Sequence, residues 1–363
     1  MSIVMRLPSR FRALPRPAAA IALATAVLVI LGLLWIALSV PQTDSAASSN
    51  GGDLAMYGRL VDRMRHGEDY YAAARTELSA GHYAMQSVFN WRTPLLPWFL
   101  SLFPTLFWPQ VLFMLATLLA AGLSCKLVFD EVGWIAAGLL AIVEILALGT
   151  CLVPQTVAFS EFAAGVLILL SASAYGLRRP YLGLGAAALA LFVRELAAPY
   201  VLIAIYLAWR QKRYGELKVW ALVLFAYAGY FLWHTHMVQL HQSPGDLADH
   251  TGWVEVGGAP FLLDTSAFNG FFLLTPLWVT ALVLPLSCLG LLAWPGGAGQ
   301  RMALTLMTYL LLFAFVGKSY NEYWGAIYTP VMSVGLVLVP TALRDLWRAL
   351  WVKAETEQAP STI

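Results

Sequence analysis

The carboxylate with the most distinctive setting in this sequence is that of Asp53. It follows the pair Gly51-Gly52 and comes soon after the first long apolar run of the chain. A carboxylate in such a position can serve as a general base toward a hydroxyl group. The structural alternative is a helix N-cap, a role in which Asp contributes about 1 kcal/mol to helix stability. The residue types leave both interpretations open.

Further ionisable side chains lie inside apolar stretches, where each costs about 2.5–3.5 kcal/mol or more unless it is paired or hydrated. Arg194 and Glu195 stand in the segment FVRELAAPY, and Lys318 stands in GKSYNEYWGAIYTP. Glu144 and Glu161 lie near the same predicted face of the membrane. Such residues are functional candidates by default, and the alternative is a structural ion pair, either Arg194–Glu161 or Lys318–Glu144.

The composition defines the elements that must position these residues. The chain has 363 residues, of which 60% are hydrophobic and 12% charged, and its mean hydropathy is +0.71. Soluble domains carry about 25% charged residues, so the sequence predicts an all-α, multi-spanning membrane protein. The formal charge of +2 and the lack of lysine or arginine runs give no sign of a nucleic-acid partner. Three cysteines without paired spacing predict neither a disulfide nor a metal site.

Apolar runs bounded by charged or turn residues predict about ten spans. The run near residues 18–40 exceeds the length of a signal-peptide core, so we expect a retained anchor. The halves of 181–209 are each too short for an upright crossing, and Pro199 with the Arg194–Glu195 pair predicts a break between them. The spans are 18–40, 106–125, 134–150, 157–177, 181–193, 197–209, 218–235, 271–293, 302–317 and 326–343.

The basic residues predict the orientation. With the N-terminus inside, 15 of the 22 lysines and arginines fall on inner segments, as the positive-inside rule requires. The predicted organisation is a basic cytoplasmic tail (1–17), one transmembrane domain (18–350) and a cytoplasmic tail (351–363). The two long loops, 41–105 and 236–270, are both on the outer side, whereas the inner loops are short. Function usually lies in such long loops.

The first outer loop predicts a short interfacial amphipathic helix. Leu54, Tyr57, Val61 and Met64 recur at helical spacing, and charged residues fall opposite them. The apolar side is expected in the acyl boundary and the charged side in water. After Gly67 the sequence Glu-Asp-Tyr-Tyr predicts a second helix cap, and Trp91, Arg92 and Trp98 are typical of an interfacial belt. The H-x-H sequence at 234–236 has no accompanying cysteine, so no metal site is predicted there.

These features together resemble the GT-C superfamily of integral membrane glycosyltransferases. The resemblance rests on an outward carboxylate after the first span, D-x-x-x-Y, followed by G-x-x-Y-Y and an aromatic–Arg–x–Pro entry to the next span. It covers most of the chain as architecture, whereas the large soluble C-terminal domain of some members has no counterpart. The segments are GGDLAMY (51–57), GEDYYAAA (67–74), FNWRTPLLPWFLSLFP (89–104), FVRELAAPY (192–200) and NEYWGAIYTP (321–330).

The resemblance implies an inverting transfer of a sugar from a polyprenyl-phosphate donor to an envelope glycan, lipid or protein, on the periplasmic face of a bacterial inner membrane. Asp53 matches the catalytic base, and Arg194 matches the donor-phosphate ligand, with Lys318 as second choice. No resident cofactor is implied, and a weak need for a divalent metal is the alternative. The residues expected to bind substrate or support the site are Tyr57, Glu68, Asp69, Arg92, Glu161, Glu195, Tyr320, Asn321 and Tyr323, with the choice between Glu68 and Asp69 open.

The main rival is a secondary transporter or lipid flippase, because broken helices and intramembrane charges are typical of both. Paired inverted repeats would favour a transporter, and the other half of the sequence shows no second broken segment to match FVRELAAPY. A non-catalytic assembly subunit is a third class. Neutralising Asp53, Glu161 and Arg194 together would leave such a subunit intact.

Overall fold

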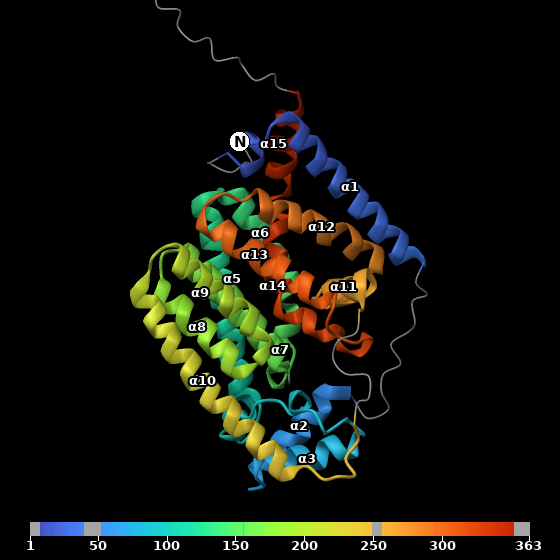
Figure 1. The fold of residues 1–363 in the computed structure, drawn as a ribbon, viewed down its shortest axis with the longest axis vertical. Helices are drawn as coiled ribbons and strands as arrows, with labels where there is room; N and C mark the ends of the chain where they lie inside the picture. The colour runs from blue at the N-terminus through green and yellow to red at the C-terminus, as the bar shows by residue number, and fades with distance from the viewer. Residues whose placement is uncertain (1–7, 40–51, 155, 249–255, 352–363) are drawn as a thin grey trace, which may run out of the picture.

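A computed structural model describes residues 8–39, 52–154, 156–248 and 256–351, and within these ranges the chain is helical with no strand (Figure 1). The predicted all-α class is therefore confirmed for the described part. Predictions that fall on the N-terminal seven residues, on 40–51, on 249–255 and on the tail after Trp351 lie outside the described residues.

Three helices of the described chain are long and apolar enough to cross a membrane: α1 (Arg16–Ser39), α5 (Phe107–Glu131) and α10 (Tyr214–His241). The pair α14 (Thr329–Leu336) and α15 (Val339–Trp351) passes the same test together, although it is bent by 54°. Large apolar side chains such as Leu28, Leu115 and Phe225 are exposed along the three long helices. Exposed surface of this kind suits hydrocarbon rather than water, so the chain associates with membranes.

The other predicted spans correspond to shorter helices. They are α6 (Trp134–Ala147), α7 (Ser160–Gly176), α8 (Pro180–Val193), α9 (Ala198–Arg210), α12 (Leu277–Ala293) and α13 (Gly296–Phe313). Each predicted range therefore overlaps a helix. A count of ten membrane crossings stays a prediction, because helices of 13 to 18 residues are at or below the length of about 20 residues that an upright crossing needs.

Helix α7 forms the centre of the molecule and packs against α5, α8, α13 and α14. Most of its residues are buried, because small side chains let its neighbours approach closely. Gly165 shows this directly: a Cβ atom there would lie 2.0 Å from the carbonyl oxygen of Ala326 in η7 (Ser319–Ile327). One end of this central helix carries Glu161 and the other carries Tyr175.

The predicted break in FVRELAAPY is confirmed. Arg194 follows α8 with extended backbone (φ −151°, ψ 118°), and a short 3₁₀ turn, η5 (Glu195–Ala197), leads into α9 with Pro199 in its first turn. The expectation of no second broken segment was wrong, since α14 and α15 are separated by a bend. The bend at Val337–Leu338 precedes Pro340, which lies in the first turn of α15. Proline has no N–H to donate to the carbonyl group four residues earlier, and its ring clashes with that carbonyl, which here belongs to Leu336, the last residue of α14.

One end of the molecule is built from α2 (Gly52–Arg65), α3 (Tyr70–Ala80), η2 (Val88–Asn90) and α4 (Leu95–Ser101) (Figure 1). The predicted helix cap after Gly67 is confirmed, because Asp69 accepts a hydrogen bond from the backbone N–H of Tyr71 (2.9 Å). The predicted amphipathic helix is also present. Its apolar side, with Tyr57 and Val61 buried, packs on α3 and α4 rather than facing only lipid. The expected contact with lipid is replaced in part by contact with α3, because α3 also has apolar residues, and they are buried against α2.

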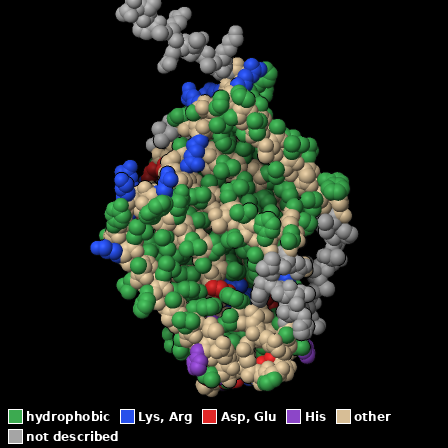
Figure 2. All heavy atoms as spheres, viewed as in Figure 1, with side chains coloured by type: hydrophobic (Ala, Val, Ile, Leu, Met, Phe, Trp, Pro, Cys, Tyr) green, Lys and Arg blue, Asp and Glu red, His purple; other side chains and the backbone are tan. Residues whose placement is uncertain are grey.

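The opposite end contains η1 (Arg10–Ala13), the start of α1 and α15 (Figure 1). The backbone N–H of Ser9 donates to Asp345 of α15 (3.0 Å), which ties the two ends of the described chain together. Most of the Lys and Arg side chains visible in Figure 2 lie toward this end, whereas apolar side chains cover the middle. The remaining elements are η3 (Gly149–Leu152), η4 (Thr156–Ala158), α11 (Gly258–Ala267) and η6 (Phe272–Leu274).

Candidate functional site

A cavity of about 400 Å³ lies at the α2–α3 end of the molecule. It is formed where α2, the end of α3, the chain before α4 and η7 meet, and Figure 2 shows a hollow toward this end in which acidic and basic side chains are visible. Six residues singled out from the sequence line it: Asp53, Tyr57, Arg92, Tyr320, Asn321 and Tyr323. The other lining residues are Met56, Leu78, Gly81, His82, Tyr83, Ala84, Asn90 and Trp324.

Asp53 lies inside the first turn of α2, one residue beyond the start of the helix. The N-cap interpretation is therefore wrong, although a carboxylate in a first turn still interacts favourably with the helix dipole. Its Oδ1 accepts a hydrogen bond from the hydroxyl group of Tyr83. Burial, together with this hydrogen bond to Asp53, raises the pKa of Tyr83, so the phenol remains a neutral donor. The bond fixes one oxygen of the carboxylate at the cavity.

Sequence reasoning missed Tyr83. It follows Gly81, the C-cap residue of α3, and His82, which has a positive φ of 55°. A Cβ atom on Gly81 would lie 2.4 Å from Tyr83 Cε2, so the absence of a side chain there leaves space for the ring. A glycine ending a helix just before a tyrosine was the available signal, but many surface turns carry the same pattern.

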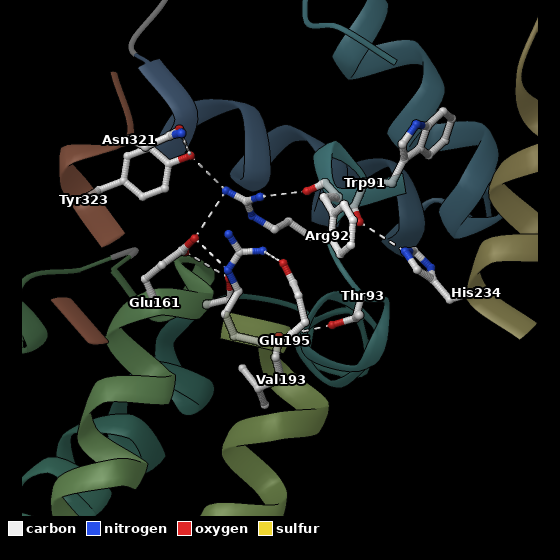
Figure 3. A network of polar contacts seen from close by, with 12 residues as sticks. Trp91, Arg92, Thr93, Glu161, Val193, Glu195, His234, Asn321 and Tyr323 are labelled. Carbon is white, nitrogen blue, oxygen red and sulfur yellow. Dashed lines mark hydrogen bonds and ion pairs between the residues drawn. The ribbon is translucent and has the colours of Figure 1, made fainter. Parts of the chain in front are cut away.

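Arg92 supplies the cation at the cavity. Its guanidinium donates to the hydroxyl group of Tyr323 (3.1 Å) and forms an ion pair with Glu161 (3.2 Å; Figure 3). It also lies 5.7 Å from the centroid of the Tyr57 ring, within the range of a cation–π contact. The side chain is 10% exposed, and its buried Nε has no hydrogen-bond partner among the described residues. Because Arg92 lines the cavity, its guanidinium can be reached by an anionic ligand bound there.

Behind Arg92 lies a second arginine. Arg194 is 2% exposed, and its Nε is 2.9 Å from Glu161, whose carboxylate is shared between the two arginines. Arg194 also contacts Glu195. The structural alternative, an Arg194–Glu161 pair, is therefore present. Arg194 does not line the cavity, so the guanidinium that shares a cavity with Asp53 is that of Arg92.

Lys318, the second choice for a phosphate ligand, is buried beside the cavity. Its Nζ lies 5.9 Å from the centroid of the ring of Tyr320, which lines the cavity. The alternative pair with Glu144 is not formed in the described part of the chain. Glu144 accepts instead from the hydroxyl group of Ser124 (3.4 Å).

The two acidic residues between which the sequence could not choose lie outside the cavity. Asp69 is the N-cap of α3, and Glu68 is paired with Arg63 (3.2 Å). Arg63 and Arg59 both bond to Glu77 of α3 (2.6 and 2.7 Å). Burial acts to raise the pKa of Glu77, but the hydrogen bonds from Arg63 and Arg59 outweigh it and lower the pKa. This network joins α2 to α3.

An apolar groove of about 300 Å³ lies between α4, α5, α7 and α8. Three of its lining residues, Leu95, Ala163 and Val193, stand within three positions of Arg92, Glu161 and Arg194 along the chain. The arginine cluster therefore has a polar cavity and an apolar groove as neighbours. The other lining residues are Leu96, Phe99, Pro109, Leu112, Phe113, Ala116, Val157, Val166, Leu167 and Leu189.

No group of three or more His, Cys, Asp or Glu side chains in the described ranges has the arrangement of a metal site. His234, the first residue of the H-x-H sequence, is buried and bonds to Tyr71 and to the backbone of Trp91. Its contacts in this structure are therefore those of a structural histidine.

Fold and site together define a helical, membrane-associated protein in which a carboxylate and a guanidinium face one cavity. Comparisons with family models, with curated proteins and with solved structures gave no match. The resemblance to the GT-C superfamily therefore stays a prediction.

Proposed function

We propose that the protein is a membrane glycosyltransferase that moves a sugar from a polyprenyl-phosphate donor to an envelope glycan, lipid or protein acceptor. The observation that carries the proposal is the cavity in which Asp53 and Arg92 both line the wall. An acid–base group and a phosphate ligand facing one space are what such a transfer requires.

The chemistry follows from these two groups. Asp53 takes the proton of the acceptor hydroxyl group, and the oxygen of that hydroxyl attacks the anomeric carbon of the donor sugar. The bond between that carbon and the phosphate oxygen breaks, and the electron pair leaves with the polyprenyl phosphate. Arg92 stabilises the negative charge on this leaving phosphate through its fork of N–H donors. Attack from the face opposite the phosphate inverts the anomeric centre.

The structure favours Arg92 over Arg194 as the phosphate ligand. Arg194 is engaged by two carboxylates and is 2% exposed. Arg92 shares only the Glu161 carboxylate and lines the cavity. We infer that Arg194 acts indirectly, by holding Glu161 in the position where that carboxylate also orients Arg92.

The apolar groove supports a lipid-linked donor. Its walls are aliphatic and aromatic, and residues that adjoin the arginine cluster along the chain line it. A polyprenyl tail in this groove would bring its phosphate toward Arg92 without burying a polar group. Free nucleotide-sugar donors would leave such a groove without a use.

Sidedness belongs to the same proposal. The segments rich in arginine and lysine lie toward the end opposite α2 and α3 (Figures 1 and 2). By the positive-inside rule, that end is cytoplasmic. We therefore propose that the cavity lies on the periplasmic face of a bacterial inner membrane. Both termini then lie on the cytoplasmic side.

The test is incubation of the purified protein in lipid nanodiscs with a panel of radiolabelled polyprenyl-phosphate sugars and an envelope extract. Wild-type protein should consume one donor, and Asp53→Asn should abolish consumption while expression and thermal unfolding stay unchanged. The matched control is Asp62→Asn, because Asp62 lies on the same helix with its side chain 62% exposed and pairs with Arg65. Donor consumption by Asp53→Asn at the wild-type rate would remove Asp53 from the base role.

A secondary transporter or lipid flippase is the alternative, favoured by the 54° bend between α14 and α15. A second broken helix is common in transporters. The same panel separates the two classes when the protein is reconstituted in liposomes. A flippase would move the labelled lipid between leaflets with its sugar still attached, whereas a transferase would release the polyprenyl phosphate.

A further inference from the structure

His234 of α10 is the most completely buried ionisable side chain near Arg92 that the proposed chemistry does not use. It is 0% exposed, and both of its ring nitrogens have partners. Nε2 lies 3.1 Å from the carbonyl oxygen of Trp91, and Nδ1 lies 3.0 Å from the hydroxyl group of Tyr71. Figure 3 shows His234 beside Trp91, next to Arg92 in the chain.

These contacts define the tautomer. A carbonyl oxygen only accepts hydrogen bonds, so Nε2 must carry the hydrogen. Nδ1 then accepts from the hydroxyl group of Tyr71. The ring of Tyr71 is itself held between His241, whose ring is stacked 5.5 Å away, and Trp233, which contacts its edge at 5.7 Å. The imidazole is therefore fixed in position, with Nε2 as the donor to Trp91.

Arg92 and Thr93, which follow Trp91, also form hydrogen bonds with residues of other helices. The hydroxyl group of Tyr70 in α3 donates to the carbonyl oxygen of Arg92. The hydroxyl group of Thr93 donates to the carbonyl oxygen of Val193 at the end of α8 (3.2 Å; Figure 3). Both peptide groups that flank the Cα atom of Arg92 thus have a carbonyl bonded from a different helix, and His234 supplies the first of these bonds.

We propose that His234 is a positioning residue that acts through Arg92: by holding the carbonyl group of Trp91, it keeps the Arg92 guanidinium directed at the cavity. Without that bond, the Trp91 carbonyl would be buried without its partner, and the segment would have to shift to find one. The shift would move the guanidinium away from Glu161 and Tyr323. This inference rests on the proposed function only in the choice of ligand for its first test.

The first test measures the binding of farnesyl phosphate, a short polyprenyl phosphate, to the purified full-length protein by ³¹P NMR. His234→Leu should weaken binding about 10-fold, the upper range for one lost hydrogen bond. His234→Gln should bind nearly as wild type, because its amide can donate to Trp91 and accept from Tyr71. The control is His236→Leu, two residues along and exposed, which should change nothing.

A double-mutant cycle separates positioning from a general structural effect. In an Arg92→Ala background, His234→Leu should produce no further loss of binding, because the residue through which it acts is absent. An equal loss with and without Arg92 would overturn the proposal. So would unchanged binding by His234→Leu in the otherwise wild-type chain.

A second measurement needs no ligand. Phenylglyoxal modifies exposed arginines, and peptide mass spectrometry reports each site separately. Arg92 should react several-fold faster in His234→Leu than in wild type and His234→Gln, as judged against exposed Arg59 and buried Arg301. Unchanged protection of Arg92, or equal release of Arg301, would overturn the positioning role. Failure of the wild type to bind farnesyl phosphate would count against the proposed donor, and this labelling would still decide the role of His234.

Discussion

The two ends of α7 each carry a buried arginine cluster, and they differ in what surrounds the guanidinium. At the Tyr175 end, the guanidinium of Arg301 lies 3.8 Å from the centroid of the Tyr175 ring. The hydroxyl group of Tyr175 donates to Glu216 (2.7 Å), which is paired with Arg213. An aromatic ring thus covers the Arg301 guanidinium, and the residue is 3% exposed.

At the Glu161 end, two arginines share a carboxylate, and the outer one, Arg92, lines a cavity together with Asp53. An unpartnered nitrogen does not distinguish the two clusters, because Arg92 Nε and Arg301 Nη1 both lack a hydrogen-bond partner among the described residues. Burial of an arginine in a membrane protein therefore does not by itself mark a site. The distinguishing feature is access from a cavity that also holds a group able to act on a bound ligand.

The largest expected effect separates the two clusters directly. Arg92→Met should lower donor consumption at least about 100-fold, the loss typical of removing one group that stabilises transition-state charge. Arg301→Met should leave consumption within about twofold, because a cation–π contact of about 2 kcal/mol supports packing and not the reaction. Both variants keep an unbranched chain of similar length. The labelled-donor assay measures both variants. An inactive Arg301→Met together with an active Arg92→Met would contradict the assignment of the site to the Arg92 cluster.

A second comparison concerns the carboxylate in each cluster. Glu161 is fully buried and serves two arginines, so Glu161→Gln should destabilise the protein by about 3 kcal/mol, as expected when one partner of a buried ion pair is removed. Glu216→Gln should cost less, because its partner Arg213 is 27% exposed and can be hydrated. The midpoint of SDS-induced unfolding in mixed micelles measures both. Equal shifts for the two variants would show that the sharing of Glu161 adds nothing to stability.

Much of this arrangement could be predicted from residue patterns, and the remainder depended on contacts between distant segments. The break at Arg194 followed from charge and Pro199 in a run too short for two crossings, and the cap at Asp69 followed from local sequence. These patterns could not predict that Arg92, and not Arg194, lines the cavity. Both are arginines near one face, and only the packing of α4 on α8 places one in front of the other.

Tyr83 and His234 show the same limit. A tyrosine after a helix and a histidine in an apolar helix are common, and each gains its role from a partner 30 or 143 positions away. Conversely, Glu68 is a candidate because the resemblance implies a second charged group in the first outer loop. Its partner Arg63, five residues away, satisfies it locally.

The smallest expected effect concerns the ion pairs that join α2 to α3 beside the cavity. Hydrogen bonds from Arg63 and Arg59 lower the pKa of Glu77 against the effect of its burial. A carboxyl group whose folded-state pKa is lowered stabilises the fold above its unfolded value of about 4.5 and loses that contribution as the pH falls through the folded-state pKa.

Glu77→Gln should therefore lower the thermal unfolding midpoint at neutral pH by only a few degrees, about 1 kcal/mol or less, because Arg59 and Arg63 are 48% and 41% exposed. The difference between the wild type and Glu77→Gln should shrink as the pH falls below about 4.5. Arg301→Met provides the reference, since it contains no carboxyl group and its difference from wild type should not follow that pH dependence. A Glu77→Gln difference that stays constant through acid pH would mean that the carboxylate charge does not hold α2 to α3, and that other contacts, such as the apolar packing of Tyr57 and Val61 and the Tyr83–Asp53 hydrogen bond, order the cavity end.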